Sequence, residues 1–425
     1  MQHKTIACFI FLFTILFNTH KSSAQVPAGT NVDESKVKPY TLPDPLQMQD
    51  GKKVTNVNDW NNIQRPYIYH LFEENVYGRI PRIKLTQTFR VRETGDAIGG
   101  LATRKQIRIY LSTADTSAFI DLLLYLPKSK TKAPVFVGYN FNGNQTVQAD
   151  PAIFISENPL RDSRLKNADG TASDSTRGIA SNSWDVKNII KNGIGLVTAY
   201  YGDIEVDTKD GWQTGIRTKL KDELKIQPAE WSAISAWAWG LMRIMDYLEQ
   251  DSNIDAKHVA LFGHSRLGKT ALWTGATDQR FAMVISNESG EGGAALARRN
   301  YGETIKDLNE RFPHWFVGKY RTYNNNASAM PVDQHMLLSL IAPRPLYVAS
   351  AEDDQWSDPK GEFLSAVNAA SVYALFGKKG LGTDKMPPLN TSVGNTIRYH
   401  ERTGKHAVTE FDWQQYIKFV NEQFK

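Results

Sequence analysis

Cysteine is almost missing from this sequence, which holds a single one, Cys8, in 425 residues. One thiol cannot form an intramolecular disulfide, so a disulfide-stabilised scaffold is excluded and the packing of a hydrophobic core must stabilise the fold. The chain is long enough for this, because the buried fraction of a protein's surface rises with its length. We therefore expect a large folded domain without disulfides.

Long apolar runs are also missing. The one marked run, Thr5 to Phe17, is shorter than the roughly 20 residues that cross a bilayer. It lies between Lys4 and the small residues Ser22-Ser23-Ala24, an order typical of a secretory signal. We therefore expect residues 1–24 to be a signal peptide, a secreted or periplasmic protein that starts at Gln25, and no membrane partner. The alternative is a retained N-terminal anchor.

Charge of one sign is scarce as well. The chain has 50 basic and 45 acidic residues, and loss of Lys4 and Lys21 with the signal peptide lowers the net charge from +5 to +3. So small an excess is not the basic surface that binds nucleic acids, which excludes a nucleic-acid partner. The sequence also lacks His, Asp and Glu at the spacing of metal ligands, so we expect neither a metal nor a cofactor.

What the sequence does contain is a serine in a glycine-rich turn, Gly263-His264-Ser265-Arg266-Leu267-Gly268-Lys269, which follows the apolar run Val259 to Phe262. The run predicts a buried strand and the residues after the turn predict a helix. A sharp strand-to-helix turn raises the serine hydroxyl above the sheet, as a nucleophile requires. The usual motif has glycine two residues after the serine, whereas here Leu267 holds that place and Gly268 follows. The alternative is an ordinary tight turn with a solvated serine.

The pattern around this turn changes from strands alone to strands alternating with helices. A helix is predicted at 60–77, then strands at 83–91, 106–111, 119–126 and 135–139. Further strands follow at 195–199, 259–262, 283–286, 346–349 and 396–400, with helices at 184–192, 230–250, 334–340, 361–376 and 409–424. Long polar loops are predicted at about 145–183 and 289–333.

This alternation predicts parallel βαβ units preceded by antiparallel strands. No linker separates two halves. We therefore predict an α/β protein with the α/β-hydrolase fold, a three-layer αβα sandwich around a mixed, mostly parallel sheet. Residues 25–425 would form a single catalytic domain that begins with a proline-containing N-terminal arm.

In this fold the catalytic histidine follows the serine and the acid in the chain. His314 and His335 fall in a long loop and before a helix, and His400 falls within the last strand. His406 lies in the loop between the last strand and the last helix, so we predict it as the catalytic base. The alternative is a surface histidine in that loop.

Two strands end in carboxylates that could orient the histidine. Glu288 follows the strand at 283–286, and Asp353-Asp354 follow the strand at 346–349. Either carboxylate could hold the imidazole in the required tautomer and stabilise its positive form. The sequence leaves the choice between Glu288 and Asp354 open.

Four segments of the chain together resemble the bacterial glucuronoyl esterases of carbohydrate esterase family 15. They are the Ser265 turn, Asn287-Glu288-Ser289-Gly290-Glu291-Gly292-Gly293, Trp356-Ser357-Asp358-Pro359 and Gly404-Lys405-His406. The resemblance covers most of the chain after the signal peptide. Fungal members carry cysteine at the place of His264, whereas bacterial members commonly show histidine, so a disulfide there is excluded.

The resemblance implies a serine esterase that cleaves the ester between the C6 carboxyl of (4-O-methyl-)glucuronic acid on xylan and an alcohol of lignin. It implies Ser265 as nucleophile, His406 as base and acid, and Glu288 as the usual acid of the triad. Asp354 matches an alternative acid of bacterial members, and Arg266 would stabilise the oxyanion. The sugar ring would be bound by Lys269, Glu303 and Trp356. The partners are glucuronoxylan and lignin–carbohydrate esters, and we expect a monomer.

Two other functions fit parts of the same pattern. An acetyl xylan esterase, or another carbohydrate O-acyl esterase, would use the same triad and would need no group to hold a uronic acid. A glycan-binding module on an inactive hydrolase scaffold would need no triad at all. The presence of serine, histidine and two acids in the required order disfavours this last alternative.

Overall fold

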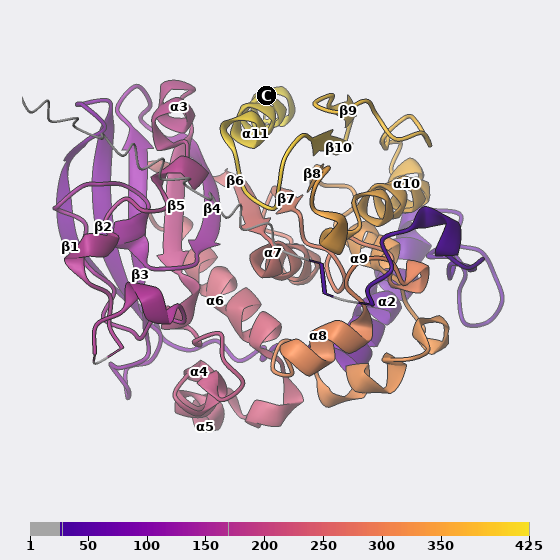
Figure 1. The fold of residues 1–425 in the computed structure, drawn as a ribbon. Coiled ribbons are helices and arrows are strands. Elements are labelled where there is room, and N and C mark those ends of the chain that lie inside the picture. The colour runs from indigo at the N-terminus through magenta and orange to yellow at the C-terminus, as the bar shows by residue number, and fades with distance from the viewer. Residues whose placement is uncertain (1–25, 28, 169, 425) are drawn as a thin grey trace, which may run out of the picture.

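The computed structural model describes residues 26–27, 29–168 and 170–424 (Figure 1). The predicted signal peptide lies outside the described residues. Among the residues that are described, no helix has both the length and the apolar character needed to cross a membrane.

One sheet runs through the described part of the chain, with its strands in the order β1-β2-β3-β5-β4-β6-β7-β8-β10-β9. The strands are β1 Thr88–Ala97, β2 Ala102–Tyr110, β3 Phe119–Pro127, β4 Ala133–Asn140, β5 Gly195–Tyr200, β6 Ile254–His264, β7 Met283–Asn287, β8 Leu346–Ala351, β9 Val393–Gly394 and β10 Ile397–Arg402. The pairs from β5 to β10 are parallel, whereas β1 to β3 and the short β9 pair antiparallel. The predicted mixed, mostly parallel sheet is confirmed.

Helices cover both faces of this sheet (Figure 1). They are α1 Val57–Asp59, α2 Arg65–Phe72, α3 Val186–Lys191, α4 Ile216–Lys219, α5 Lys221–Leu224, α6 Ala233–Leu248, α7 Arg266–Thr277, α8 Ile305–Arg311, α9 Gln334–Ser339, α10 Pro359–Leu375 and α11 Glu410–Gln423. Because β6 is buried on both sides, its residues alternate between two cores. Leu261 packs into the core with α6, α7, α9 and α10, and Phe262 packs with α3 and α11. This is the predicted three-layer arrangement.

Two strands, β1 and β6, depart most from their predicted bounds. The first strand was predicted at 83–91, but β1 begins only at Thr88 and continues to Ala97. It lies at the edge of the sheet, where most of its side chains are exposed or half-buried, so alternation of apolar residues marks it poorly. Similarly, β6 begins at Ile254, five residues before the predicted apolar run, because its first residues are largely solvent-accessible and polar.

The loop predicted at 289–333 is not the polar excursion that the sequence indicates. It contains α8 and three segments of 3₁₀ helix, and its aromatic residues Trp315, Phe316 and Tyr320 are buried. The prediction was wrong because polar residues between these aromatics hide a locally folded structure that packs on the main core. The other long loop, 145–183, contains short 3₁₀ turns and one isolated bridge, between Lys166 and Ala172, in its described residues.

The N-terminal arm is pinned to this inserted segment. The backbone N–H of Gly302 donates to the carbonyl of Asn31 over 2.8 Å. Glu34 forms ion pairs with Arg299 and with Lys360 at the start of α10. The predicted arm therefore lies along the segment that follows β7, next to the site described below.

Candidate active site

Ser265 lies in the sharp turn between β6 and α7, with φ 58° and ψ −130°. A positive φ is unusual for serine and marks the strained turn that exposes a nucleophile. Gly263 is required because a Cβ there would lie 2.0 Å from the carbonyl oxygen of Leu267. Gly268 is required as well, since its Cβ would lie 2.9 Å from the Cβ of Ser289. The close approach thus falls on residue 268, which explains why Leu267 can replace the usual glycine.

All eight side chains predicted for the site line one hollow of about 220 Å³, called the catalytic hollow here: Ser265, Arg266, Lys269, Glu288, Glu303, Asp354, Trp356 and His406. They come from the turn after β6, the segment after β7, the loop after β8 and the loop after β10. The carboxyl ends of neighbouring strands meet at one edge of the sheet, which is why such distant residues converge.

His406 faces both candidate acids. Its Nδ1 lies 2.6 Å from Oδ2 of Asp354 and 3.1 Å from Oε2 of Glu288. Both carboxylates are buried, while the imidazole is 31% exposed. The sequence leaves open which of the two acids contacts the histidine. In the structure both do, since the two carboxylates lie close to the same imidazole nitrogen, Nδ1.

The two acids differ in their electrostatic state. Burial raises the pKa of Glu288 to about 7, against the opposing effects of His406 and Arg402. Burial also acts to raise the pKa of Asp354, but the hydrogen bond and the positive charge of His406, with the hydrogen bond of Ser357, together outweigh it and lower this pKa. Burial would lower the pKa of His406, whereas the two carboxylates raise it to about 10. Asp354 is thus the acid that stays ionised beside the imidazole.

Arg402, at the end of β10, was missed by the sequence analysis. Its Nη2 donates to Oε1 of Glu288 over 2.6 Å, and its Nε donates to Asp412 over 2.9 Å. The backbone N–H of Ala407 donates to the other oxygen of Glu288 over 3.0 Å. Glu288 therefore has partners besides His406, and it also holds the loop that carries the imidazole. The sequence did offer one indication of a role for Arg402, namely its position at the carboxyl end of a predicted strand, where the site residues gather.

Arg266 follows the serine and is held by a buried acid that was also missed. Its Nη1 donates to Oδ2 of Asp207, which is fully buried. The guanidinium lies 4.8 Å from the ring centre of Trp315. Its Nε is buried and has no hydrogen-bond partner among the described residues. Asp207 lies in the polar loop after β5, where a strand end could have indicated it.

Lys269 lies one turn into α7 and is buried, not solvated. Its Nζ donates to the carbonyl oxygens of Ser289 and Glu291 over 2.5 and 2.6 Å, and to Glu303 over 2.8 Å. Burial raises the pKa of Glu303 despite this neighbouring ammonium. The pair forms a polar wall of the catalytic hollow.

Trp356 is half-buried at the rim of the same hollow. The guanidinium of Arg311, from α8, lies 5.3 Å from the centre of its ring. An indole with an accessible face can stack on the apolar face of a pyranose ring. The geometry therefore allows the sugar contact predicted for Trp356.

A second hollow of about 410 Å³ also contains Ser265, Arg266 and His406 in its lining and is called the neighbouring hollow here. Its other walls include Phe141, Trp184, Ile179 and Val408. A group attached to Ser265 would thus have space on two sides, one with many charged residues in its lining and the other lined largely by uncharged residues, several of them aromatic or aliphatic.

Folding also brings together three groups that sequence spacing does not suggest as a cluster. Ligand atoms of His264, Glu288 and His406 all lie within 4.8 Å of one another. Nδ1 of His264 is bonded to the side-chain oxygen of Asn287 over 2.6 Å. Arg402 already neutralises Glu288, and a fixed positive charge beside a carboxylate disfavours a cation there. The hydrogen bonds of His264 with Asn287 and of Glu288 with Arg402 explain why these groups lie together, without a metal ion.

Comparison with known proteins connects this geometry to characterised relatives. The family model described as "Glucuronyl esterase, fungi" matches residues 179–377. A carbohydrate esterase from an unknown prokaryotic organism is 42% identical over 425 residues, which are 99% of this chain and 98% of that protein. A 4-O-methyl-glucuronoyl methylesterase from Schizophyllum commune is 27% identical over 79% of this chain and 74% of its own length.

Solved structures agree. The glucuronoyl esterase from Solibacter usitatus has 48% sequence identity and a TM-score of 0.86. The match covers 92% of this chain and 100% of the Solibacter chain. A promiscuous esterase of carbohydrate esterase family 15 from a marine bacterial metagenome has 44% identity and a TM-score of 0.87, covering 93% and 100%. These relatives favour a glucuronoyl esterase over the acetyl xylan esterase alternative.

Proposed function

The chain belongs to carbohydrate esterase family 15, the glucuronoyl esterases, and from this membership we propose the bond that it cleaves. It is a carboxylic ester hydrolase, and the proposed substrate is the ester between the C6 carboxyl of (4-O-methyl-)glucuronic acid on glucuronoxylan and an alcohol of lignin. The observation that carries this proposal is the convergence of Ser265, His406 and two acids on one hollow with a polar sugar-facing wall.

In the proposed mechanism, His406 takes the proton of Ser265 through Nε2 as the serine oxygen attacks the ester carbonyl. Negative charge develops on the carbonyl oxygen beside Arg266 and the N-terminus of α7, which starts at Arg266. The imidazolium then protonates the departing alcohol and leaves the glucuronoyl group on the serine. Water attacks this acyl-enzyme with the same base, and release of glucuronate restores the serine.

Asp354 is the proposed principal acid of the triad. Its hydrogen bond to Nδ1 of His406 is the shorter one, at 2.6 Å against 3.1 Å for Glu288. Its pKa is lowered, so it stays ionised when the imidazole becomes positive. Glu288, shared with Arg402, would add a weaker attraction and fix the His406 loop.

In the proposed complex, the parts of the substrate on either side of the ester bond lie in different hollows. The uronic acid ring would lie in the catalytic hollow, where Trp356 stacks on it and the carboxylate of Glu303, held by Lys269, accepts from its hydroxyl groups. The alcohol would lie in the neighbouring hollow, whose apolar wall suits an aromatic alcohol such as those of lignin.

Comparison of esters tests the proposal. We expect hydrolysis of benzyl and methyl glucuronate and little release of acetate from acetylated xylan. The Ser265→Ala variant should lose at least about 10⁴-fold in kcat, while Ser183→Ala, which removes another hydroxyl that lines the neighbouring hollow, should keep it. Unchanged turnover in Ser265→Ala would refute the serine mechanism. Preferential release of acetate would identify an O-acetyl esterase instead.

The remaining sequence predictions concern the whole chain. We propose a signal peptide at 1–24, secretion or periplasmic export, and a single catalytic domain at 25–425 that acts as a monomer. N-terminal sequencing of the exported protein should begin at Gln25, and light scattering should give the mass of one chain. A retained N-terminus, or the mass of a dimer, would refute the corresponding part.

A further inference from the structure

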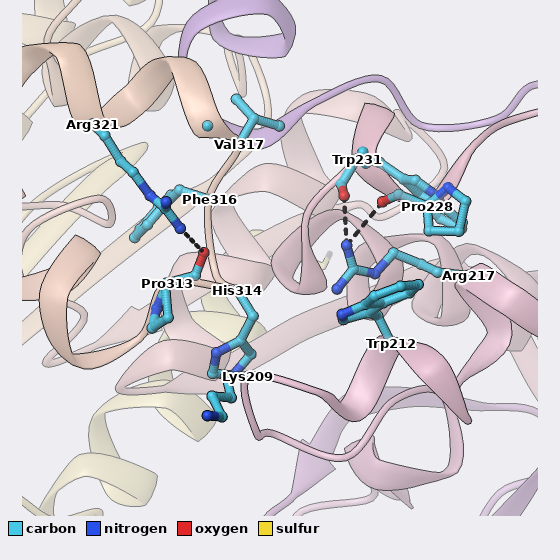
Figure 2. A pocket seen from close by; sticks show the side chains of 12 residues that line it. Lys209, Trp212, Arg217, Pro228, Trp231, Pro313, His314, Phe316, Val317 and Arg321 are labelled. Atoms are coloured by element: carbon cyan, nitrogen blue, oxygen red, sulfur yellow. Dashed lines mark hydrogen bonds between the residues drawn. The ribbon is translucent and has the colours of Figure 1, made fainter.

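We propose that a third hollow binds a uronate-bearing saccharide at a site distinct from the one that holds the ester (Figure 2). This hollow has a volume of about 420 Å³ and is called the Trp212 hollow here. Its walls come from the segment around Lys209 and Trp212, the residues before α6, and the 3₁₀ helix Gly318–Tyr323. Its existence does not depend on the proposed ester hydrolysis.

Two exposed cations stand at its walls. The one ion pair of Lys209 among the described residues is a long contact with Asp210, 4.0 Å, in which both side chains are largely exposed. Arg321 donates from Nη2 to the carbonyl of Pro313 over 3.2 Å (Figure 2), and no carboxylate within the described ranges forms an ion pair with it. A third cation, Arg217, is buried and neutralised by Glu205. The hollow therefore offers uncompensated positive charge to an anionic ligand.

Two buried polar nitrogens in the lining residues add to this. His314 has a side chain only 6% exposed, and its Nδ1 lacks a hydrogen-bond partner in the described structure. The Nε1 of Trp231 is also buried and, among the described residues, unpartnered. An unpaired buried polar group is costly, so each of these atoms would gain from a partner that a small shift of its ring brought within reach. A sugar hydroxyl can supply either partner, whereas a carboxylate can accept only from the indole N–H, because Nε2 of His314 donates to Asp207 and leaves Nδ1 of the neutral ring as an acceptor.

Trp212 supplies the apolar part of the site. Its ring is half-buried among the lining residues, so part of its surface stays accessible to a ligand. An aromatic face combined with cations suits a saccharide that carries a carboxylate, because the ring can stack on a pyranose while the cations meet the charge. A neutral saccharide would use the ring but not the cations.

The Trp212 hollow lies next to the catalytic hollow. Trp315 lines the catalytic hollow, whereas its neighbours His314 and Phe316 line the Trp212 hollow. His314 also bonds through Nε2 to Asp207 over 2.7 Å, and Asp207 holds Arg266. A polysaccharide seated in the Trp212 hollow would therefore be held close to the reacting ester of the same or a neighbouring chain.

Calorimetric titration with a xylotriose that carries free glucuronic acid tests the site, with unsubstituted xylotetraose as the neutral comparison. We expect two sites per chain for the acidic sugar, one of them weakened about ten-fold in Arg321→Ala and in Lys209→Ala. Lys319→Ala is the matched control, because it lies in the same 3₁₀ helix but pairs with Glu74 outside the hollow. It should leave both sites unchanged.

Kinetics give a second readout. Arg321→Ala should raise KM for a polymeric glucuronoxylan ester while leaving kcat/KM for methyl glucuronate unchanged. Binding of a single acidic sugar per chain, unaffected by Arg321→Ala, would refute the second site. Equal affinity for xylotetraose at that site would refute its selectivity for a uronate. Neither result would bear on whether Ser265 hydrolyses the small ester.

Discussion

At the scale of single residues, the main question is how one imidazole uses two carboxylates. His406 meets Asp354 and Glu288 on the same nitrogen, which carries a single proton in the neutral ring. Strand order placed both acids near the end of a strand, but the sequence could not rank them. The ranking depends on Arg402, which donates a hydrogen bond to Glu288. These two residues lie 114 positions apart in the sequence.

The first prediction concerns this ranking. Asp354→Asn should lower kcat on methyl glucuronate by about 10²–10⁴-fold, because the imidazole loses its closer charged partner and its preferred tautomer. Glu288→Gln should cost less, about 10-fold, since its amide can still contact Ala407. Steady-state kinetics decide the order, with Asp353→Asn as a control because Asp353 is exposed and adjacent. A larger loss in Glu288→Gln would reverse the assignment.

The second prediction is the direction of a pH shift. Activity requires neutral His406, so kcat/KM rises as pH increases through the pKa of this group. The hydrogen bond that Nδ1 of His406 donates to Asp354 raises that pKa, so removing the carboxylate charge lowers it. The acidic limb of the residual activity of Asp354→Asn should therefore move to lower pH than in the unmodified enzyme. Profiles of kcat/KM from pH 4 to 11 measure this, and a limb at the same or higher pH would contradict it.

The third prediction concerns Asp207, a positioning residue for Arg266. Its carboxylate also accepts from Trp315 and His314, each over 2.7 Å. Asp207→Asn should lower kcat by about 10–100-fold with little change in KM, because Arg266 would lose the charge that orients it toward the developing oxyanion. The exposed Asp210→Asn in the same loop is the control. A change confined to KM would assign Asp207 to ground-state binding instead.

At the scale of elements, the sequence predicted strands and helices well wherever burial is one-sided or complete. The core strands β4 to β8 were found because apolar runs of this length fit a sheet covered on both faces. The edge strand β1 was predicted with shifted bounds and the polar start of β6 was missed, because their side chains lack a regular contrast between buried and exposed faces. Likewise, no local pattern marked α8 within a stretch rich in polar residues.

The turn that carries Ser265 supplies the fourth prediction. A methyl group at residue 268 would meet Ser289 and the segment that carries Glu288. Gly268→Ala should therefore displace that segment from α7, lower kcat by about 10-fold or more, and lower Tm by a few degrees. Gly318→Ala is the control, because nothing lies within 4 Å of the added methyl. Thermal unfolding and kinetics on methyl glucuronate measure the two effects, and wild-type values for both would show that the displaced glycine is not needed.

At the scale of the whole molecule, the fold and the convergence of the proposed catalytic residues on one hollow could be predicted because strand order fixes which loops meet. The partners that tune these residues could not, because Arg402 and Asp207 reach the site only through tertiary packing. The hollows were also beyond the sequence, since each combines side chains from several loops. The folded structure adds two separate hollows next to Ser265, the catalytic hollow and the neighbouring hollow.

This division gives the last prediction, on the alcohol side of the ester. Ile179 lines the neighbouring hollow and is 48% exposed, so a change there should disturb the ligand more than the fold. Ile179→Asp should lower kcat/KM for benzyl glucuronate by about 10-fold, because an aromatic alcohol loses apolar contact and meets a charge. Methyl glucuronate, whose alcohol is too small to fill the hollow, should react nearly as before. Val91→Asp, at an exposed apolar residue of β1 that does not line the hollow, is the control. Equal losses of kcat/KM for both esters would indicate a general effect on Ser265, which does not depend on the leaving group. In that case the alcohol does not lie in the neighbouring hollow.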